Sequence, residues 1–527
     1  MKKNTRNYLF IAFAYVVILV GIMFLGYSFL PEEKIQLEPS SRYTDSNNQK
    51  VEDIITIINK KYVDEVNADS LQHLPIDSLL HQLDPHSAYL PPVKASQMTE
   101  VLEGNFEGIG VEYYISNDTL LVTNVLRDGP AFLGGLKQGD KILKVDSVMV
   151  SGRSLPRSEM MGRIKGKKGT TVQLLVARSG APNPTLLSIK RGRVDVSSID
   201  AAYMLTSETA YVRISKFGAN TDKDFAEIVR GLKGRGMRKL ILDLRDNGGG
   251  YVSAATGLAN QLLQEKKLIV YTEGKHEPRT DYFTTGGGEF EQGKLVVLIN
   301  ENSASASEIL AGAIQDLDRG TIIGRRSFGK GLVQEQFPFE DGSALNLTVA
   351  RYYTPLGRSI QKSYKKKSYT AYQQEIEDRL NDGELTGTRN TRAKDSLQKI
   401  SVYLTAAGKR VFGGGGIQPD IHVKLDTVGY NKFYGTLVEK RVLFDFVFNV
   451  LAERYTATYL SQNLGSFTIS DTDYRDLINY IQSRNIKIDP KALAAAKPII
   501  YNDVKVMLCK YHLGDQGYYK ALNLTDP

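Results

Sequence analysis

The sequence of 527 residues predicts a multidomain α/β protein. The first observation is an alternation of short apolar runs with helical patterns, seen in the runs 295–299 and 321–324 and in the helical pattern 309–317 between them. Such alternation is typical of a sheet covered by helices. The second observation is length, because at roughly 150 residues per domain the chain is expected to hold about three to four domains. The third is helical periodicity within the segment 427–527, which predicts a C-terminal helical domain.

Composition and charge exclude several classes of protein. A hydrophobic content of 42% and a charged content of 24% are ordinary for a globular protein. The net charge of +8 is spread along the chain without a recognisable nucleic-acid-binding motif, so we expect no nucleic-acid partner. Cys509 is the only cysteine, so the chain forms no internal disulfide.

An uncharged segment, residues 8–30, follows three basic residues near the N-terminus. At ~1.5 Å per residue it is long enough to cross a hydrocarbon core of ~30 Å. Basic residues before it and acidic residues after it predict that the N-terminus stays inside and the rest of the chain lies outside. We therefore expect a transmembrane signal anchor over residues 1–31. A cleaved signal peptide is the alternative, since residues 26–28 weakly resemble a cleavage site.

Ser305 and Lys330 are the candidate catalytic pair. Ser305 ends a polar turn between the apolar run 295–299 and the helical pattern that follows it. Lys330 lies on a glycine-punctuated loop, residues 327–334, after the next apolar run. A serine nucleophile and its base are commonly found at a strand-to-helix turn and on a neighbouring loop of this kind. Ser305 and Glu308 also match a capping box, which by itself indicates only a helix start.

The same segment contains the spacing of a phosphate-binding loop, Gly-x-x-x-x-Gly-Lys, at residues 324–330. Gly331 follows it where magnesium binding requires Ser or Thr, and no clear helical pattern comes next. Nucleotide binding is therefore the weaker interpretation, and the sequence implies no metal and no cofactor.

Two blocks of this segment, Ser-Ala-Ser-Glu at 305–308 and Phe-Gly-Lys-Gly-Leu-Val-Gln at 328–334, resemble the C-terminal processing peptidases, also called tail-specific proteases. Further matching blocks keep the same order, so the resemblance covers roughly residues 45–425. In that family the Ser of the first block is the nucleophile and the Lys of the second is the general base. The resemblance thus implies a serine endopeptidase in which Ser305 forms an acyl-enzyme and Lys330 is the base. The further blocks are residues 83–89, 241–250, 350–358 and 416–420.

A lysine acts as a general base only when its amine is neutral, so the pKa of Lys330 must fall from ~10.4 towards ~7–8. Burial lowers the pKa of a lysine, and apolar neighbours such as Ile322 and Phe328 supply dry surroundings. A Ser–His–Asp triad fits less well, because no histidine lies in this segment and the Gly-x-Ser-x-Gly elbow is absent. We expect Gln334 to orient the catalytic pair, and Glu308 to act as a helix cap or as a further site residue.

An acyl-transfer site also needs hydrogen-bond donors for the oxyanion. By resemblance these are the backbone N–H groups of Ala306 and Gly249. Gly249 lies in a glycine-rich turn after the strand predicted at 240–244, where glycine allows the backbone to approach a substrate. The family usually has Pro where this chain has Gly248, so we expect a looser turn here.

Residues 97–192 resemble a PDZ domain. Phe-Glu-Gly-Ile-Gly-Val at 106–111 resembles the carboxylate-binding loop, in which successive N–H groups hold a chain terminus. The strand predicted at 110–115 would take up a substrate tail as an added strand, and the helix predicted at 158–165 would line the groove. Lys165 stands where many relatives have Arg. The resemblance therefore does not imply that this position couples the binding of a substrate tail to the active site. The candidate peptide-binding residues are Gly108, Ile109, Gly110, Val111, Met161 and Ile164.

Three further segments complete the predicted organisation. Helical patterns at 51–62 and 76–83 predict an N-terminal helical region over 40–96, to which we assign no chemistry. The resemblance implies that residues 193–426 form the protease core, an α/β spiral related to the crotonase fold. A charged insertion at 362–410 interrupts this core, and we expect it to be exposed and partly mobile. The C-terminal helical domain is a candidate for oligomerisation or partner docking.

Together these observations favour a membrane-anchored serine endopeptidase on the periplasmic side of a bacterial inner membrane. Its substrates would be proteins or peptides with apolar C-terminal tails, held by the PDZ domain while the serine attacks a carbonyl upstream. Such tethering raises the local concentration of the scissile bond. The alternative function is a catalytically silent PDZ adaptor that only binds peptides. The sequence leaves open whether the partner of the chain is a second copy of itself or a regulatory adaptor.

Overall fold

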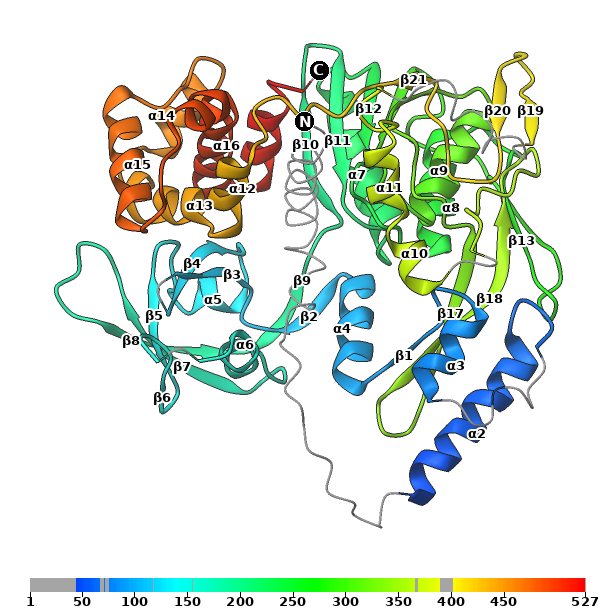
Figure 1. Ribbon diagram of the computed structural model, residues 1–527, viewed down its shortest axis with the longest axis horizontal. Coiled ribbons are helices and arrows are strands. Elements are labelled where there is room, and N and C mark those ends of the chain that lie inside the picture. The colour runs from blue at the N-terminus through cyan, green and yellow to red at the C-terminus, as the bar shows by residue number, and fades with distance from the viewer. Residues whose placement is uncertain are drawn as a thin grey trace. The chain divides into compact units, whose positions relative to one another are not determined.

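The computed structural model describes residues 44–66, 71, 75–116, 118–153, 155–364, 368–388 and 401–526 (Figure 1). The chain divides into two compact units, each built from segments that are distant in the sequence. The first is Met1–Glu103 with Ser198–Val428, and the second is Gly104–Ser197 with Gly429–Pro527. None of the helices in the described part of the chain is long and apolar enough to cross a membrane. The anchor predicted over residues 1–31 lies outside the described residues.

A six-stranded sheet forms the centre of the first unit. In order across the sheet its strands are β10 (Ile199–Met204), β11 (Thr209–Ile214), β12 (Lys239–Asp243), β15 (Lys294–Ile299), β16 (Thr321–Gly324) and β21 (Ile421–His422). Strands β11 to β21 run parallel, whereas β10 is antiparallel to β11. Leu242, Val297 and Ile322 lie in register on β12, β15 and β16, and all three are fully buried. The predicted α/β architecture is therefore confirmed.

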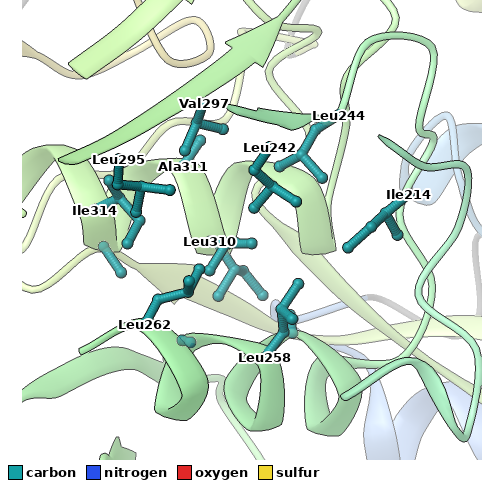
Figure 2. Packing of buried hydrophobic residues seen from close by; sticks show 14 of the residues in the cluster. Ile214, Leu242, Leu244, Leu258, Leu262, Leu295, Val297, Leu310, Ala311 and Ile314 are labelled. Carbon is teal, nitrogen blue, oxygen red and sulfur yellow. The ribbon is translucent and has the colours of Figure 1, made fainter. Parts of the chain in front are cut away.

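Helices α7 (Thr221–Gly234), α8 (Val252–Leu262) and α9 (Ala306–Asp316) belong to the same unit. Their apolar faces join the apolar side chains of the sheet in one buried cluster. Figure 2 shows Leu258 of α8 and Leu310 of α9 pointing into this cluster, and both are fully buried. Because burying one leucine side chain stabilises a fold by ~2 kcal/mol, the cluster supplies a rigid base for the loops at the strand ends.

A second sheet of the first unit contains residues from the predicted Lys330 loop. Its strands are β1 (Ala88–Leu90), β18 (Ala344–Tyr353), β13 (Leu268–Glu273) and β14 (Thr280–Phe283), with β17 (Leu332–Pro338) paired to β18. The prediction that residues 332–334 lie in a loop is therefore wrong. Leu332 pairs with Arg351 of β18, and such pairing between distant segments overrides the local glycine signal.

The N-terminal helical region packs on this second sheet. Helices α2 (Thr44–Lys61) and α3 (Ile76–Leu83) match the two predicted helices, and α4 (Pro92–Glu103) follows β1. Ile54 of α2 and Leu80 of α3 form a buried cluster with Leu345 and Leu347 of β18. The region thereby becomes part of the first unit.

The charged insertion is more ordered than expected. Its helices α10 (Tyr369–Gln373) and α11 (Glu375–Asn381) lie in the described segment 368–388, and a hairpin of β19 (Val402–Leu404) and β20 (Arg410–Phe412) follows. Tyr372, Leu380 and Leu385 are only 1–2% exposed. The expectation of an exposed segment is therefore wrong for these three side chains, which belong to the buried interior, whereas others of the same segment, such as Tyr369 and Gln373, are exposed as expected.

The second unit contains a β-rich domain that matches the predicted PDZ domain. Its main sheet consists of β3 (Val111–Ser116), β4 (Thr119–Val125), β5 (Lys141–Val145), β7 (Thr171–Ala177) and β8 (Thr185–Lys190), with β6 (Val148–Met149) paired to β5. The strands β2 (Asn105–Gly108) and β9 (Gly192–Asp195) form a separate ribbon, and the helices are α5 (Pro130–Leu133) and α6 (Arg157–Ile164). Strand β3 lies at one edge of the main sheet, so one side of it is unpaired within the domain.

The C-terminal segment is helical, as predicted. Its helices are α12 (Lys432–Glu439), α13 (Val442–Phe446), α14 (Ala457–Asn463), α15 (Asp471–Ser483) and α16 (Pro490–Leu522), and a π-helical turn, Val447–Leu451, follows α13. The helices pack on the PDZ domain of the same unit. The rings of Tyr114 on β3 and Phe444 on α13 lie 4.1 Å apart, and the side chain of Lys510 lies 3.6 Å from that of Glu112.

Candidate active site

Three neighbouring strands of the central sheet end beside one another. The turn 244–250 follows β12, the turn leading to Ser305 follows β15, and the loop carrying Lys330 follows β16. Because these strands are adjacent and parallel, the three segments emerge at the same edge of the sheet. In open α/β sheets, ligands bind at this carboxyl edge.

Ser305 adopts an unusual backbone conformation at the N-terminal end of α9. Its φ is 54° and its ψ is −114°, a combination that a residue with a side chain rarely adopts. Such strain costs about 1–3 kcal/mol and persists only where the surrounding structure holds it, which is common at functional sites. The backbone N–H of Ser305 donates to Glu308 Oε2 at 2.9 Å, so part of the restraint is local.

Glu308 holds the serine turn and the lysine loop together. Its Oε2 accepts the N–H of Ser305 and the N–H of Lys330, both at 2.9 Å. Its Oε1 accepts the N–H of Gly329 at 2.7 Å and the hydroxyl of Ser327 at 2.5 Å. Burial raises the pKa of Glu308, and these hydrogen bonds oppose that effect. Because all four partners donate, the ionised carboxylate is the form that the geometry accommodates. The capping role indicated by the sequence is therefore only part of what Glu308 does.

Tyr352 holds the same two residues from the other side. Its hydroxyl lies 2.8 Å from the carbonyl oxygen of Lys330 and 3.1 Å from that of Ser305. Tyr352 is on β18 and is 1% exposed. Sequence analysis placed this tyrosine in a matching block but assigned it no role. Ser305 and Lys330 are thus held at both their N–H and their carbonyl groups by two buried side chains.

The side chain of Lys330 has a neutral hydrogen-bond partner. Its Nζ donates to Gln334 Oε1 at 2.7 Å. Removal from water lowers the pKa of Lys330 to about 8, while the negative charges of Asp84 and Glu308 act in the opposite direction. With that pKa, about a tenth of the amine is neutral at pH 7. Among the described residues, Gln334 Nε2 is buried without a hydrogen-bond partner. The structure therefore brings the predicted Lys330 and Gln334 together.

Gly249 contacts Ser305, but its N–H points elsewhere. A Cβ atom on Gly249 would lie 2.8 Å from Ser305 Cβ and 3.0 Å from the nitrogen of Ala306, and its φ is +104°, so only glycine fits. The N–H of Gly249 donates to Asn247 Oδ1 at 2.9 Å, and Asn247 is fully buried. In this structure a side chain of the same turn therefore accepts this N–H, and the role of Gly249 as an oxyanion donor stays a prediction. Ala306, the first residue of α9, is at the helix end where N–H groups lack helical acceptors.

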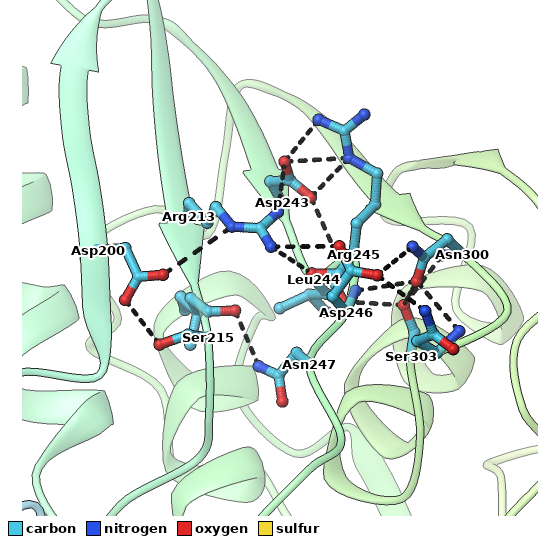
Figure 3. Close-up of polar contacts among 12 residues, drawn as sticks. Asp200, Arg213, Ser215, Asp243, Leu244, Arg245, Asp246, Asn247, Asn300 and Ser303 are labelled. Atoms are coloured by element: carbon cyan, nitrogen blue, oxygen red, sulfur yellow. Dashed lines mark hydrogen bonds and ion pairs between the residues drawn. The ribbon is translucent and has the colours of Figure 1, made fainter. Parts of the chain in front are cut away.

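A polar network supports the turn 244–250 (Figure 3). Buried Asp243 lies 3.1 Å from Arg213 and 2.7 Å from Arg245. Burial acts to raise the pKa of this carboxyl, but the two guanidinium groups outweigh it and hold the pKa well below its usual range. Asn300 Nδ2 donates to Asp246 at 2.7 Å, which ties this turn to the one before Ser305. Asp243, Arg245 and Asp246 belong to the matching block 241–250, whereas Arg213 and Asn300 lie outside every matching block.

The predicted peptide-binding residues lie between β2, β3 and α6. The turn Gly108–Val111 joins β2 to β3, and the carbonyl of Ile109 accepts the N–H of Ala131 at 2.8 Å. Ile109 and Ile164 are 1% and 4% exposed and belong to the core of the domain. Met161 on α6 is partly exposed. The structure thus buries four of the six predicted groove residues and leaves Val111 and Met161 partly exposed; the buried ones are Gly108, Ile109, Gly110 and Ile164.

The fold and this site define a PDZ-containing protein with a serine-peptidase core, and comparisons with known proteins agree. Residues 208–368 match the model of Peptidase family S41, and residues 97–177 match that of the PDZ domain. A carboxy-terminal-processing protease of Bartonella bacilliformis is 33% identical over 351 residues, which is 66% of this chain and 80% of that protein. A probable CtpA-like serine protease of Staphylococcus aureus (strain MRSA252) is 31% identical over 349 residues, which is 66% of this chain and 68% of that protein.

Among solved structures, the photosystem II D1 C-terminal processing protease is 29% identical, with 60% of this chain and 90% of that chain covered and a TM-score of 0.36. The identity and coverage of the Bartonella relative establish the family. The chain belongs to peptidase family S41 and is a carboxy-terminal-processing serine protease with a PDZ domain.

Proposed function

We propose that Ser305 is the nucleophile and Lys330 the general base of this protease. The observation that carries the proposal is that one carboxylate, Glu308, accepts the N–H groups of both residues. A second support is the lowered pKa of Lys330, about 8, which leaves a useful fraction of the amine neutral. A third is the strained backbone of Ser305.

In the proposed reaction the neutral amine of Lys330 takes the proton from Ser305 Oγ as this oxygen attacks a peptide carbonyl. The ammonium of Lys330 then gives that proton to the leaving amine, and an acyl-enzyme forms on Ser305. In the second half, Lys330 takes a proton from water as the water oxygen attacks the ester, and the ammonium then returns that proton to Ser305 Oγ as the bond to the acyl group breaks and the product acid leaves. Gln334 orients the amine of Lys330 through the hydrogen bond to its Oε1. The N–H of Ala306, at the positive end of α9, donates to the oxyanion.

We infer that the PDZ domain holds the C-terminal tails of substrates. The unpaired edge of β3 supports the addition of a peptide strand, and the turn Gly108–Val111 supplies backbone N–H groups for a carboxylate. Met161 of α6 would contact an apolar side chain of the tail. Substrates with apolar tails are therefore the proposed class.

We further propose that the protease works on the outer side of a membrane, anchored by its N-terminus. The uncharged residues 8–30, with basic residues before them and acidic residues after them, support an anchor in the inner membrane that leaves the protease in the periplasm. The C-terminal helices are the proposed surface for a second copy of the chain or for a regulatory adaptor.

The test measures cleavage of an unstructured protein with an apolar C-terminus by the full chain in detergent. We expect Ser305→Ala and Lys330→Ala to lower kcat/KM by ~10³-fold or more, because each removes a group that changes bonding in the transition state. Lys239→Ala is the matched control, since Lys239 is an exposed lysine paired with Glu208.

Activity that survives in Ser305→Ala would overturn the assignment of the nucleophile. An inactive but tail-binding parent protein would instead favour the catalytically silent adaptor.

A further inference from the structure

A chain of hydrogen bonds leads from the lysine loop to a histidine that has no assigned role. The N–H of Gly331, the residue after Lys330, donates to Gln361 Oε1 at 2.8 Å. Gln361 Nε2 lies 3.4 Å from the hydroxyl of Tyr372, and that hydroxyl lies 2.8 Å from His86 Nε2. The chain joins the N-terminal helical region and the charged insertion, both without assigned chemistry, to the loop that carries the proposed base.

The first bond of this chain sets the direction of the second. Because Gln361 Oε1 accepts the N–H of Gly331, the other end of the amide is a donor, and it donates to the oxygen of Tyr372. The hydroxyl of Tyr372 lies 2.8 Å from His86 Nε2, and it donates there when the imidazole carries its proton on Nδ1. An imidazole that accepts at Nε2 carries its proton on Nδ1 and is neutral.

Aromatic rings and a second lysine surround the same histidine. The ring of His86 is edge-on to Tyr372, at 5.3 Å, and to Phe328, at 6.4 Å. Phe328 precedes Lys330 by two residues, so its ring belongs to the loop of the base. The Nζ of Lys362 lies 3.8 Å from the centre of the Phe328 ring and 4.2 Å from that of Tyr372. His86 therefore packs against aromatic rings next to the loop that carries Lys330.

The charges near Lys330 are consistent with a neutral histidine. Burial, followed by the positive charges of Lys330 and Lys362, lowers the pKa of His86 to about 2. Asp84 and Glu308 are the negative groups that act on Lys330. Asp84 is 1% exposed and accepts the backbone N–H of His86 at 2.8 Å, so the histidine is also fixed through its main chain. The surroundings also contain Glu375, the ion-pair partner of Lys362, together with Tyr352 and Tyr372, and burial raises the pKa of both tyrosines.

We propose that His86, held by the hydroxyl of Tyr372, is a positioning residue that keeps water away from the amine of Lys330 and so preserves its neutral form. The inference rests on the proposed role of Lys330 as general base. Under this inference the N-terminal helical region and the insertion both protect the amine of Lys330, because the first supplies His86 and the second supplies Tyr372. Removing the imidazole would admit water, which favours the ammonium form and raises the pKa of Lys330.

The test compares His86→Ala, Tyr372→Phe and His81→Ala in the full chain. His81 is the matched control, because it is an exposed histidine of the same N-terminal region that stacks on Tyr369 of α10 at 4.2 Å. The measurement is the pH dependence of the rate at which a fluorophosphonate labels Ser305, together with that of kcat/KM. Labelling reports the serine and its base without requiring a bound substrate tail.

In His86→Ala we expect the midpoint of the labelling profile to move up by ~1 pH unit, so that labelling at pH 7 slows ~10-fold and recovers above about pH 9.5. Tyr372→Phe removes only the hydroxyl, and we expect a shift in the same direction of about half that size. His81→Ala should leave the profile unchanged.

A loss of labelling by the same factor at every pH, or an unchanged profile in both variants, would overturn the inference. If His86→Ala does not fold, the shift in Tyr372→Phe decides alone. Failure of the proposed function would be distinct: Lys330→Ala would then label at the parental rate.

Discussion

Lys330 and Lys362 lie on neighbouring segments of the protease unit, and the partners of their side-chain amines differ in charge. The segments are joined by the N–H of Lys362, which donates to the carbonyl of Gly329 at 2.9 Å. Lys330 Nζ has a neutral amide oxygen, that of Gln334, at 2.7 Å. Lys362 Nζ has the carboxylate of Glu375 at 3.2 Å and lies over two aromatic rings.

The difference shows that the partner, and not burial alone, decides what a buried lysine can do. A carboxylate and the faces of aromatic rings stabilise an ammonium, so Lys362 is equipped to remain a cation. An amide oxygen gives the ammonium no full negative charge, so burial lowers the pKa of Lys330 to about 8. Of these two lysines, Lys330 is therefore the one whose surroundings suit proton transfer.

Replacing each lysine by arginine is the change with the largest expected effect. Arginine keeps the positive charge but does not deprotonate, so Lys330→Arg removes the base and should lower kcat/KM by ~10³-fold or more. Lys362→Arg preserves a cation that pairs with a carboxylate and stacks on rings, so we expect kcat/KM to stay within about tenfold of the parent value. Steady-state cleavage of an unstructured substrate measures both variants, and equal losses would contradict the comparison.

Gln334→Glu places a carboxylate beside Lys330, as Glu375 places one beside Lys362. The new negative charge should raise the pKa of Lys330 by ~1–2 units. Since the base must be neutral, activity at pH 7 should fall ~10–100-fold, and the acid limb of the pH profile of kcat/KM should move upward by the same ~1–2 units. Gln336→Glu adds the same charge further along β17 and should produce a smaller shift. A profile that stays in place in Gln334→Glu would show that Gln334 does not face the titrating amine.

Glu375→Gln is the reverse change at Lys362, and its main effect should be on stability. A lysine side chain that is only 4% exposed would lose its carboxylate partner, which typically costs about 3 kcal/mol in the free energy of unfolding. Urea denaturation followed by fluorescence measures this loss. The midpoint of the pH profile should remain near that of the parent. A stable variant with a shifted profile would mean that Glu375, and not His86, controls the base.

Much of the candidate site follows from local sequence. The apolar runs before Ser305 and before Lys330 form adjacent parallel strands, and Gln334 meets Lys330 as expected. Helix α3 has the predicted bounds, Ile76–Leu83, because its period and its ends are local properties. The pKa of Lys330 was expected to fall through burial, and removal from water lowers it to about 8, while the residue as a whole is half-buried.

Other parts of the site could not be predicted because they depend on contacts across the chain. His86 and Tyr372 are separated by 286 positions, and neither belongs to a pattern that indicates the contact. The N–H of Gly249 was expected to face a substrate, yet the side chain of Asn247 takes it, which depends on a rotamer rather than on a residue type. The insertion appeared exposed because of its charge, whereas Arg379 is buried and donates to the carbonyl of Arg326.

The sequence by itself determined many of the strands and helices, although not β17, and it determined which residues carry nucleophilic and basic groups. Those properties depend on periodicity and on residue type over a few neighbouring positions. Only the tertiary structure decided which lysine has a neutral partner and which residues hold Ser305 and Lys330. Glu308 and Tyr352 act through hydrogen bonds whose distances and directions exist only once α9, β18 and the lysine loop are packed together.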